Sequence, residues 1–224
     1  MQQKVRYEEM LPDEIQAVID EMPVAYVPVG SLEWHGYHMA VGNDAIKVHE
    51  ICMRIAREIG GAVLPALFCG VGGGHTEYFT SIMVEEEWIE PLLVRQFDCL
   101  ARHGFKVIVA MTGHYPVEQV EMVERAGETH MAKPESATVI ALPEPRAFDE
   151  DPTRGDHAGK WETSILSYLR PELVDMGRLT DGREDPLKGI SGIDPREHAS
   201  PEVGEETVAG IVRGMMRRIR EALE

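Results

Sequence analysis

The sequence predicts an α/β protein with three layers (α/β/α), in which helices cover both faces of a mostly parallel sheet. Two observations support this fold class. Short apolar runs rich in β-branched residues alternate with longer segments whose apolar residues recur at helical spacing. Such alternation is typical of strand–helix–strand units around a parallel sheet. The 224 residues fit one domain, residues 1–224, with a full-sized core.

Four apolar runs are the expected strands. They cover residues 24–29, 62–67, 105–111 and 137–142. Each is too short for a typical buried helix and consists almost entirely of apolar residues, as expected for strands buried on both faces.

Helical periodicity predicts the segments between and after these runs. The expected helices cover residues 44–59, 87–103, 116–133, 157–169 and 201–223. Glycines follow the first two, Pro116 opens the third, Pro171 follows the fourth and Ser200 caps the last. Residues 175–199 are rich in Gly, Asp and Pro and form a long loop, a kind of segment that is often functional.

Four side chains that can bind a metal ion lie within twelve residues, soon after the first strand. They are Glu33, His35, His38 and Asp44. Carboxylates combined with imidazoles suit a borderline divalent ion such as Zn²⁺ or Mn²⁺. Open α/β sheets bind ligands at the carboxyl ends of their strands. Any one of these residues is compatible with an ordinary surface loop, but the cluster indicates a metal site.

Two later segments carry the same chemistry. The strand over residues 105–111 runs into Thr112-Gly113-His114, so His114 also follows a strand. The segment that begins at Asp156 places His157 five residues before Glu162, with small residues between them. Small residues allow a metal ion or a substrate to approach closely.

These three motifs together resemble the creatininase family, the creatinine amidohydrolases. The family pattern is a G-S-x-E-x-H-G-x-H block with a following Asp, a later G-H motif, and an H-A-G-x-x-E-T-S block. All three occur here in order, over residues 30–164. The resemblance implies a hydrolase with two divalent metal ions, Zn²⁺ or Mn²⁺, and a hydroxide that bridges them.

Residue by residue, the resemblance implies two ligand sets. Glu33, Asp44 and His114 would hold one ion. His35, Asp44 and Glu162 would hold the other, so that Asp44 bridges the two. Three carboxylates and one hydroxide balance the charge of two divalent ions.

The resemblance also implies roles for residues around the metals. His157 matches the family's catalytic histidine, which passes a proton to the leaving group or binds the oxyanion. His38 is expected to brace the metal loop. Substrate-binding candidates are Tyr115, Trp34, Trp161 and His75. The tryptophans are equally compatible with packing, and His75, which ends the glycine-rich stretch 70–75, with a structural contact.

Some positions depart from the family pattern. The member that hydrolyses creatinine has a metal-binding Glu two residues after its G-H histidine, whereas this chain has Pro116. The second ion must therefore depend on Glu162. The residues before His157 and the Met39-Ala40 pair also differ. We infer that the metal centre is kept and that the substrate is not creatinine.

Three functions are compatible with these motifs. The first is hydrolysis of a C–N bond in a small polar amide, cyclic or formylated. The second uses the same centre to cleave a C–C bond in a cyclic diketone of sugar or inositol origin. The third is a metal-binding protein without catalysis, which the presence of His157 beside the complete ligand set argues against.

Composition excludes other classes of function. The net charge of −17 and the pI near 4.9 argue against nucleic-acid binding, which needs a basic surface. No apolar stretch approaches the length needed to span a bilayer, and residues 1–7 lack the apolar region of a secretory signal. Three cysteines without paired spacing favour the reducing cytoplasm. The expected partners are a small-molecule substrate and further copies of the chain, with a hexamer favoured by the resemblance. An apolar stripe along the last helix is equally compatible with association and with covering the chain's own sheet.

Overall fold

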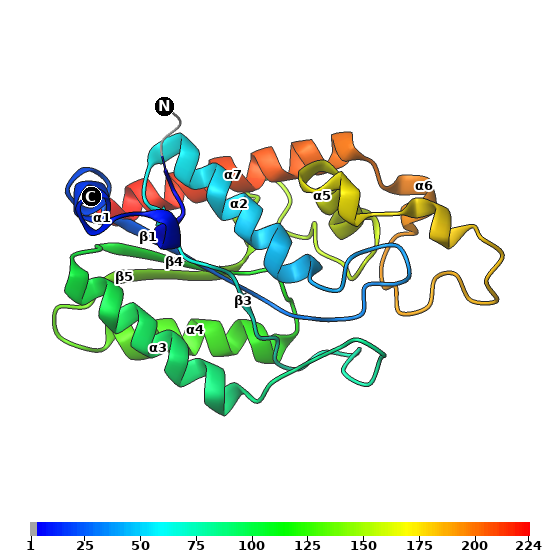
Figure 1. The fold of residues 1–224 in the computed structure, drawn as a ribbon, viewed down its shortest axis with the longest axis horizontal. Coiled ribbons are helices and arrows are strands. Elements are labelled where there is room, and N and C mark those ends of the chain that lie inside the picture. The colour runs from blue at the N-terminus through cyan, green and yellow to red at the C-terminus, as the bar shows by residue number, and fades with distance from the viewer. Residues whose placement is uncertain (1–3) are drawn as a thin grey trace.

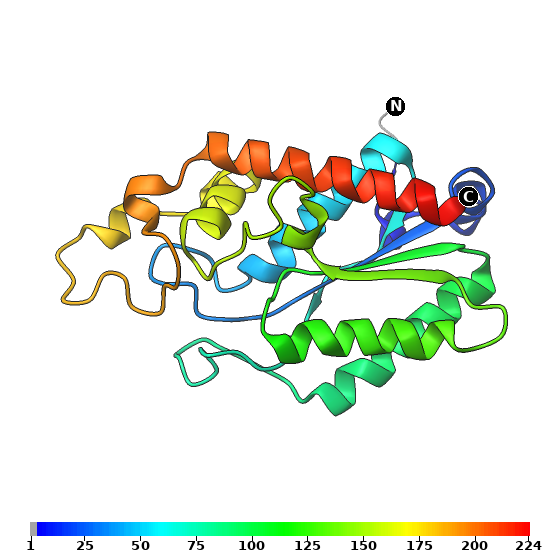
Figure 2. The same cartoon turned by 180° about the vertical axis from the view of Figure 1, so that it is seen from behind.

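The computed structural model describes residues 4–224; residues 1–3, which are part of the predicted domain and of the segment considered as a secretory signal, lie outside it. A parallel sheet is covered by helices on both faces, as predicted (Figures 1 and 2). The strands are β1 (Val24–Gly30), β2 (Ala62–Val63), β3 (Leu67–Phe68), β4 (Val107–Thr112) and β5 (Thr138–Pro143). The longer helices are α1 (Pro12–Glu21), α2 (Asn43–Ile59), α3 (Glu86–His103), α4 (Val117–Met131), α5 (Lys160–Leu169) and α7 (Pro201–Leu223).

The strand order is β2-β1-β4-β5, and β3 also pairs with β1. Every pairing is parallel. From β1 the chain crosses through α2 to β2 on one side, and then returns through α3 to β4 on the other side. The order therefore reverses between β1 and β4, and the crevice at the carboxyl ends of such neighbours is where open α/β sheets bind ligands.

Alternate residues of β1 face two different cores. Val24 and Tyr26 pack with α2, α5 and α7. Ala25, Val27 and Val29 pack with α1, α3 and α4 on the opposite face. Burial on both faces explains why the strand consists of apolar residues throughout. None of the helices in the described part of the chain is both long and apolar enough to cross a bilayer.

Several predicted boundaries are wrong. The run 62–67 forms two short strands rather than one, because Pro65 lies between them and has no N–H to donate to the ladder. The helix expected from His157 begins at Lys160, since Ala158 has a left-handed backbone (φ 53°) and His157 bridges to Ser191. The loop 175–199 contains two short helical turns, η4 (Met176–Leu179) and α6 (Pro195–His198).

The helix α1 was missed by the sequence reasoning. Its signals are nevertheless local. Pro12 occupies the first turn, and the Glu14 carboxylate accepts a hydrogen bond from the backbone N–H of Leu11 at 2.7 Å. Val18 on this helix is buried against the second core.

The apolar stripe of α7 lies inside the protein's own core. Val208, Ile211, Met215 and Ile219 are all buried there. The stripe therefore covers the sheet and gives no reason for self-association. Large apolar side chains are exposed elsewhere, on the projecting segment between β3 and α3 and on α3 itself, at Phe79, Ile82 and Trp88 (Figure 1).

Candidate metal centre

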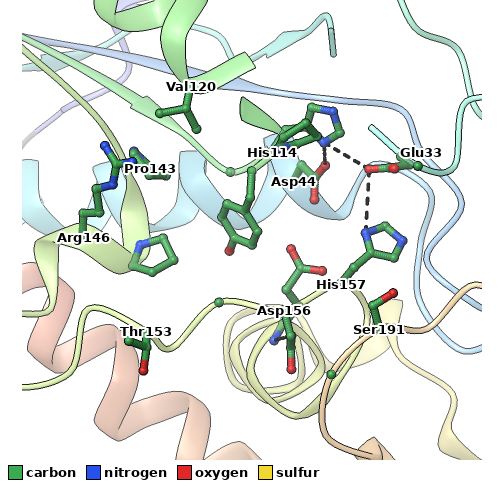
Figure 3. Close-up of a pocket in the computed structure, with 18 of the residues that line it drawn as sticks. Glu33, Asp44, His114, Val120, Pro143, Arg146, Thr153, Asp156, His157 and Ser191 are labelled. Carbon is green, nitrogen blue, oxygen red and sulfur yellow. Dashed lines mark hydrogen bonds and ion pairs between the residues drawn. The ribbon is translucent and has the colours of Figure 1, made fainter. Parts of the chain in front are cut away.

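The chain segments that follow β1 and β4 meet the start of α5 at the carboxyl edge of the sheet (Figure 3). Glu33 and His35 come from the first segment and His114 from the second. Glu162 lies in the first turn of α5. Residues far apart in sequence are thus brought to the point where the strand order reverses.

Asp44 lies at the centre of this cluster, at the second residue of α2. Its Oδ1 is 2.9 Å from His35 Nε2, and its Oδ2 is 3.0 Å from His114 Nδ1. The Ser31 hydroxyl donates to Oδ2 at 2.6 Å, and the Asn43 amide donates to Oδ1 at 3.1 Å. Both carboxylate oxygens of Asp44 are therefore oriented, one toward each histidine.

The other two carboxylates lie on either side of Asp44. Glu33 Oε2 is 3.0 Å from His114 Nδ1. Glu162 Oε2 is 3.4 Å from His35 Nε2. The structure thus brings the five candidate ligands together, with Asp44 between His35 and His114.

These five side chains fit a metal ion because they are buried and some of their polar atoms lack hydrogen-bond partners among the described residues. All five side chains are buried. Glu33 Oε2 and His35 Nε2 have short contacts but no hydrogen bond of acceptable geometry with any described group. Buried oxygen and nitrogen atoms that are left without a hydrogen-bond partner are available to coordinate a cation, and carboxylate oxygens and imidazole nitrogens are common ligands of Zn²⁺. The His35 Nδ1 lies 3.1 Å from the Glu33 carbonyl oxygen, so Nδ1 donates and Nε2 is left for the metal.

The negative charge of the buried carboxylates also favours a bound cation in this cluster. Burial alone would lower the pKa of His114, but Asp44 and Glu33 outweigh it and raise that pKa to about 9. Burial likewise opposes protonation of His35, and Asp44 and Glu162 raise its pKa well above the ordinary value. The carboxylates therefore attract positive charge strongly, and a divalent ion would take the place of those protons.

His157 has a defined tautomer. Its Nε2 lies 2.7 Å from the Trp34 carbonyl oxygen, which can only accept, so Nε2 carries the hydrogen. The other nitrogen, Nδ1, has a free lone pair and lies 3.8 Å from Glu33 Oε2. Burial, followed by the charge of His35, lowers the pKa of His157 below its ordinary value. Neutral His157 thus presents a proton acceptor to the metal cluster.

Two more histidines belong to the site, and one of them contacts His157. His75 stacks on His157, with ring centroids 3.9 Å apart, and its Nδ1 is 3.3 Å from Glu33 Oε1. His38 is buried and its Nε2 lies 2.9 Å from the Thr163 hydroxyl. Burial and the charge of His35 lower the pKa of His38 to about 4, so the neutral ring links the metal loop to α5.

A cavity of about 620 Å³ opens from the cluster. Glu33, Asp44 and His157 lie at one end of it, and Val120 and Arg146 at the other (Figure 3). His75 and Tyr115 line the wall. Pro116, Pro143, Pro145 and Pro152 contribute to the lining, and their backbones have no N–H group to donate.

The other two substrate-binding candidates lie outside this cavity. Trp34 lines a separate hollow with Tyr37 and Tyr78, and its indole N–H donates to the Lys188 carbonyl oxygen at 2.9 Å. Trp161 lies beside the charged groups of Arg154 and Lys160. Trp34 and Trp161 are next to candidate ligands in the sequence, but adjacent side chains point in different directions, so neither indole reaches the cavity.

Two buried residues at the site were missed by the sequence reasoning. Lys47, on α2, is 3.0 Å from the carboxylate of Glu144 and 2.5 Å from that of Glu162. Burial would lower the pKa of the Lys47 ammonium, but the two carboxylates outweigh it and raise that pKa. A signal existed for each residue: Lys47 lies three residues after Asp44 on the core-facing side of a helix, and Glu144 directly follows a strand.

Comparison with known proteins agrees with this geometry. A sequence model of the creatininase family, described as creatinine amidohydrolase, matches residues 8–219. The chain belongs to the creatininase family. It is 29% identical to the creatinine amidohydrolase of Pseudomonas putida over 88% of this chain and 89% of that protein. It is 26% identical to the mycofactocin precursor peptide peptidase of Mycolicibacterium smegmatis, over 89% and 85% of the two chains.

Solved creatininase structures share the fold. A tryptophan-to-phenylalanine mutant of creatininase superposes with a TM-score of 0.81 at 26% identity, covering 97% of this chain and 98% of that one. A Zn–Zn form of another creatininase mutant and a Mn form of creatininase each give a TM-score of 0.79, at 28% and 26% identity with the same coverage. Members of this family are metal-dependent hydrolases, so the protein is an enzyme of this class, with a buried Glu, Asp and His cluster that can hold metal.

Proposed function

We propose that the protein hydrolyses the C–N bond of a small polar amide, cyclic or formylated, at a centre of two divalent ions. The observation that carries this proposal is the arrangement around Asp44, whose two oxygens face two different sets of ligands. Glu33 and His114 would complete the first set, and His35 and Glu162 the second. Two ions bound there would polarise the substrate carbonyl and lower the pKa of a water molecule toward neutrality.

His157 would move the proton in this reaction. Its Nδ1 is unprotonated and faces the cluster, while its Nε2–H is held by the Trp34 carbonyl. Nδ1 can therefore accept a proton from the attacking water and deliver it to the leaving nitrogen. The stacked ring of His75 limits rotation of the His157 ring.

The cavity supports an amide substrate that extends beyond its reacting group. The reacting end would face Glu33, Asp44 and His157, and the rest of the substrate would lie toward Val120, Pro143 and Arg146 at the other end. A volume of about 620 Å³ lies within the range of sites that enclose ligands well above the size of a single small ring. Short peptides therefore belong in a substrate search, as one relative is a peptide peptidase.

Metal analysis combined with a substrate screen tests this proposal. The purified protein should contain about two divalent ions per chain, and Asp44→Ala should remove both because Asp44 contacts both ligand sets. A screen of lactams, formamides, short peptides and cyclic diketones, followed by mass spectrometry, should show addition of water across a C–N bond. Asp44→Ala protein that retains one ion at full occupancy would rule out the bridging role. Turnover of the diketones alone would replace C–N with C–C cleavage at the same centre.

A further inference from the structure

Lys47 is a fully buried lysine, 0% exposed, directly behind the metal cluster. Its ammonium donates to Glu162 Oε1 at 2.5 Å and to the Tyr115 hydroxyl at 2.5 Å, and it lies 3.0 Å from Glu144 Oε1. Removing a charged ammonium from water is expensive, and an apolar side chain of similar volume often serves a protein's stability equally well. Stability alone therefore does not explain Lys47, and its effect on the orientation of Glu162 and Glu144 does.

The two oxygens of Glu162 have separate partners. Oε1 accepts from Lys47, whereas Oε2 accepts the Ala158 backbone N–H at 2.8 Å and lies 3.4 Å from His35 Nε2. Only Oε2 therefore faces the metal-binding nitrogen of His35. The carboxylate is held at both ends, and its rotation is blocked by Lys47.

Lys47 is itself held by the ends of two strands. Tyr115 follows β4 and donates its hydroxyl to Glu144, which follows β5. Glu144 is fully buried and supplies a negative charge beside the ammonium. The Tyr115 hydroxyl is therefore bonded to Lys47 and Glu144, while Tyr115 also lines the cavity. Four elements thus meet at one ammonium group.

We propose that Lys47 is a positioning residue, which makes Glu162 a single-oxygen ligand of the ion shared with His35 and Asp44. This inference rests on the proposed dinuclear centre. Proline stands at position 116, so Glu162 is the carboxylate on which the second ion depends, besides the shared Asp44. Partners that orient metal ligands in this way commonly change metal affinity by about 10- to 100-fold when they are removed.

Metal titration of three proteins tests this role. Metal-free wild type, Lys47→Met, and Lys47→Met combined with Glu144→Gln would be titrated with Zn²⁺ and with Mn²⁺ by calorimetry and chelator competition. The double variant removes both buried charges, so it covers the case in which an unpaired Glu144 prevents the single variant from folding. The matched control is Lys133→Met. Lys133 lies on the segment between α4 and β5 and pairs with Asp98 of α3.

Both Lys47 variants should bind the first ion with a Kd within about threefold of wild type and the second about 10- to 100-fold more weakly. The control should bind both ions as wild type does. A folded double variant with two unchanged Kd values would overturn the inference. Tighter binding of the second ion would overturn it too, since Lys47 would then act on the metal only through repulsion between their positive charges. A wild type that binds a single ion would overturn the dinuclear centre itself, and this is read from the wild type before any variant is compared.

Discussion

Single side chains at this site have roles that follow from one or two contacts each. His157 is the clearest case, because the Trp34 carbonyl determines which ring nitrogen carries the hydrogen. The resemblance to the creatininase family suggests a catalytic histidine at this position, and the contact specifies the atom, Nδ1, at which a proton can be taken up. Burial and the charge of the neighbouring His35 lower the pKa of His157, which favours the neutral ring.

Replacing His157 should separate catalysis from metal binding. His157→Ala should keep the fold and the metal but lower kcat by about 100-fold or more, the usual size of a general acid–base contribution. Turnover of whichever substrate the screen identifies gives kcat, and elemental analysis gives metal content. Unchanged kcat in a metal-loaded variant would show that His157 has only a structural role.

At the scale of elements, the site depends on close contact between the end of β4 and the start of α2. A Cβ atom on Gly113 would lie 2.2 Å from the Asp44 carbonyl oxygen. The start of α2 therefore packs directly against the backbone of Gly113, and this close packing places Asp44 between the two histidines. Only glycine allows the approach.

Gly113→Ala should consequently displace Asp44. We expect a loss of about 1–3 kcal/mol in the free energy of unfolding, typical of overpacking, together with weaker binding of both ions. Urea unfolding and metal titration provide the measurements. Gly74→Ala is the matched control, since Gly74 lines the same cavity and a Cβ there would meet nothing within 4 Å. Equal behaviour of the two variants would argue against the proposed contact.

A second contact between elements involves none of the candidate metal ligands. Asp98 on α3 accepts from His130 Nδ1 at 2.8 Å and from Lys133 Nζ at 2.7 Å. Burial would raise the pKa of Asp98, but the bonds from Lys133 and His130 outweigh it and lower that pKa. A lowered carboxyl pKa stabilises the fold above the unfolded pKa of about 4, and this contribution is lost as the pH falls through the folded pKa.

Asp98→Asn should therefore reduce the free energy of unfolding by about 0.5–1 kcal/mol at pH 7, since the carboxylate is partly exposed and screened. The difference from wild type should shrink below about pH 4. Urea unfolding at a series of pH values measures it, with Asp185→Asn in the exposed loop as control. A difference that stays constant between pH 7 and pH 3 would contradict the assignment.

At the scale of the whole molecule, self-association stays a prediction. The surface expected to drive it is now the exposed apolar side chains near α3 rather than the stripe on α7. The stripe on α7 is buried in the chain's own core, whereas Phe79 is 84%, Ile82 60% and Trp88 69% exposed. Exposed apolar side chains of this size favour association. The net charge of −17 opposes it through repulsion between copies.

Light scattering at moderate salt, where repulsion is screened, should therefore give a mass several times the 25.0 kDa of one chain, with a hexamer favoured. Replacing Phe79 and Trp88 with serine should lower that mass if these side chains lie in the interface. A monomer across a wide range of concentration would contradict the prediction of an oligomer.

The sequence by itself determined the fold class and the five candidate ligands. Burial of strands on both faces leaves apolar runs that can be read locally, and Glu33, His35 and His114 each follow such a run. The resemblance to the creatininase motifs adds Asp44 and Glu162 to the candidate ligands, and these motifs are short segments within residues 30–164. Local patterns of this kind need no knowledge of which strands are neighbours.

Only the tertiary structure decided the contacts between distant segments. Lys47 meets Glu162 across 115 positions, and His157 meets the Trp34 carbonyl across 123. Trp161 adjoins the candidate ligand Glu162 in sequence but packs beside Arg154, away from the cavity. The physical reason is that side-chain direction and strand order are set by the packing of the whole sheet between its helices. A lysine on a core-facing helix therefore gains its role from residues that arrive from other elements.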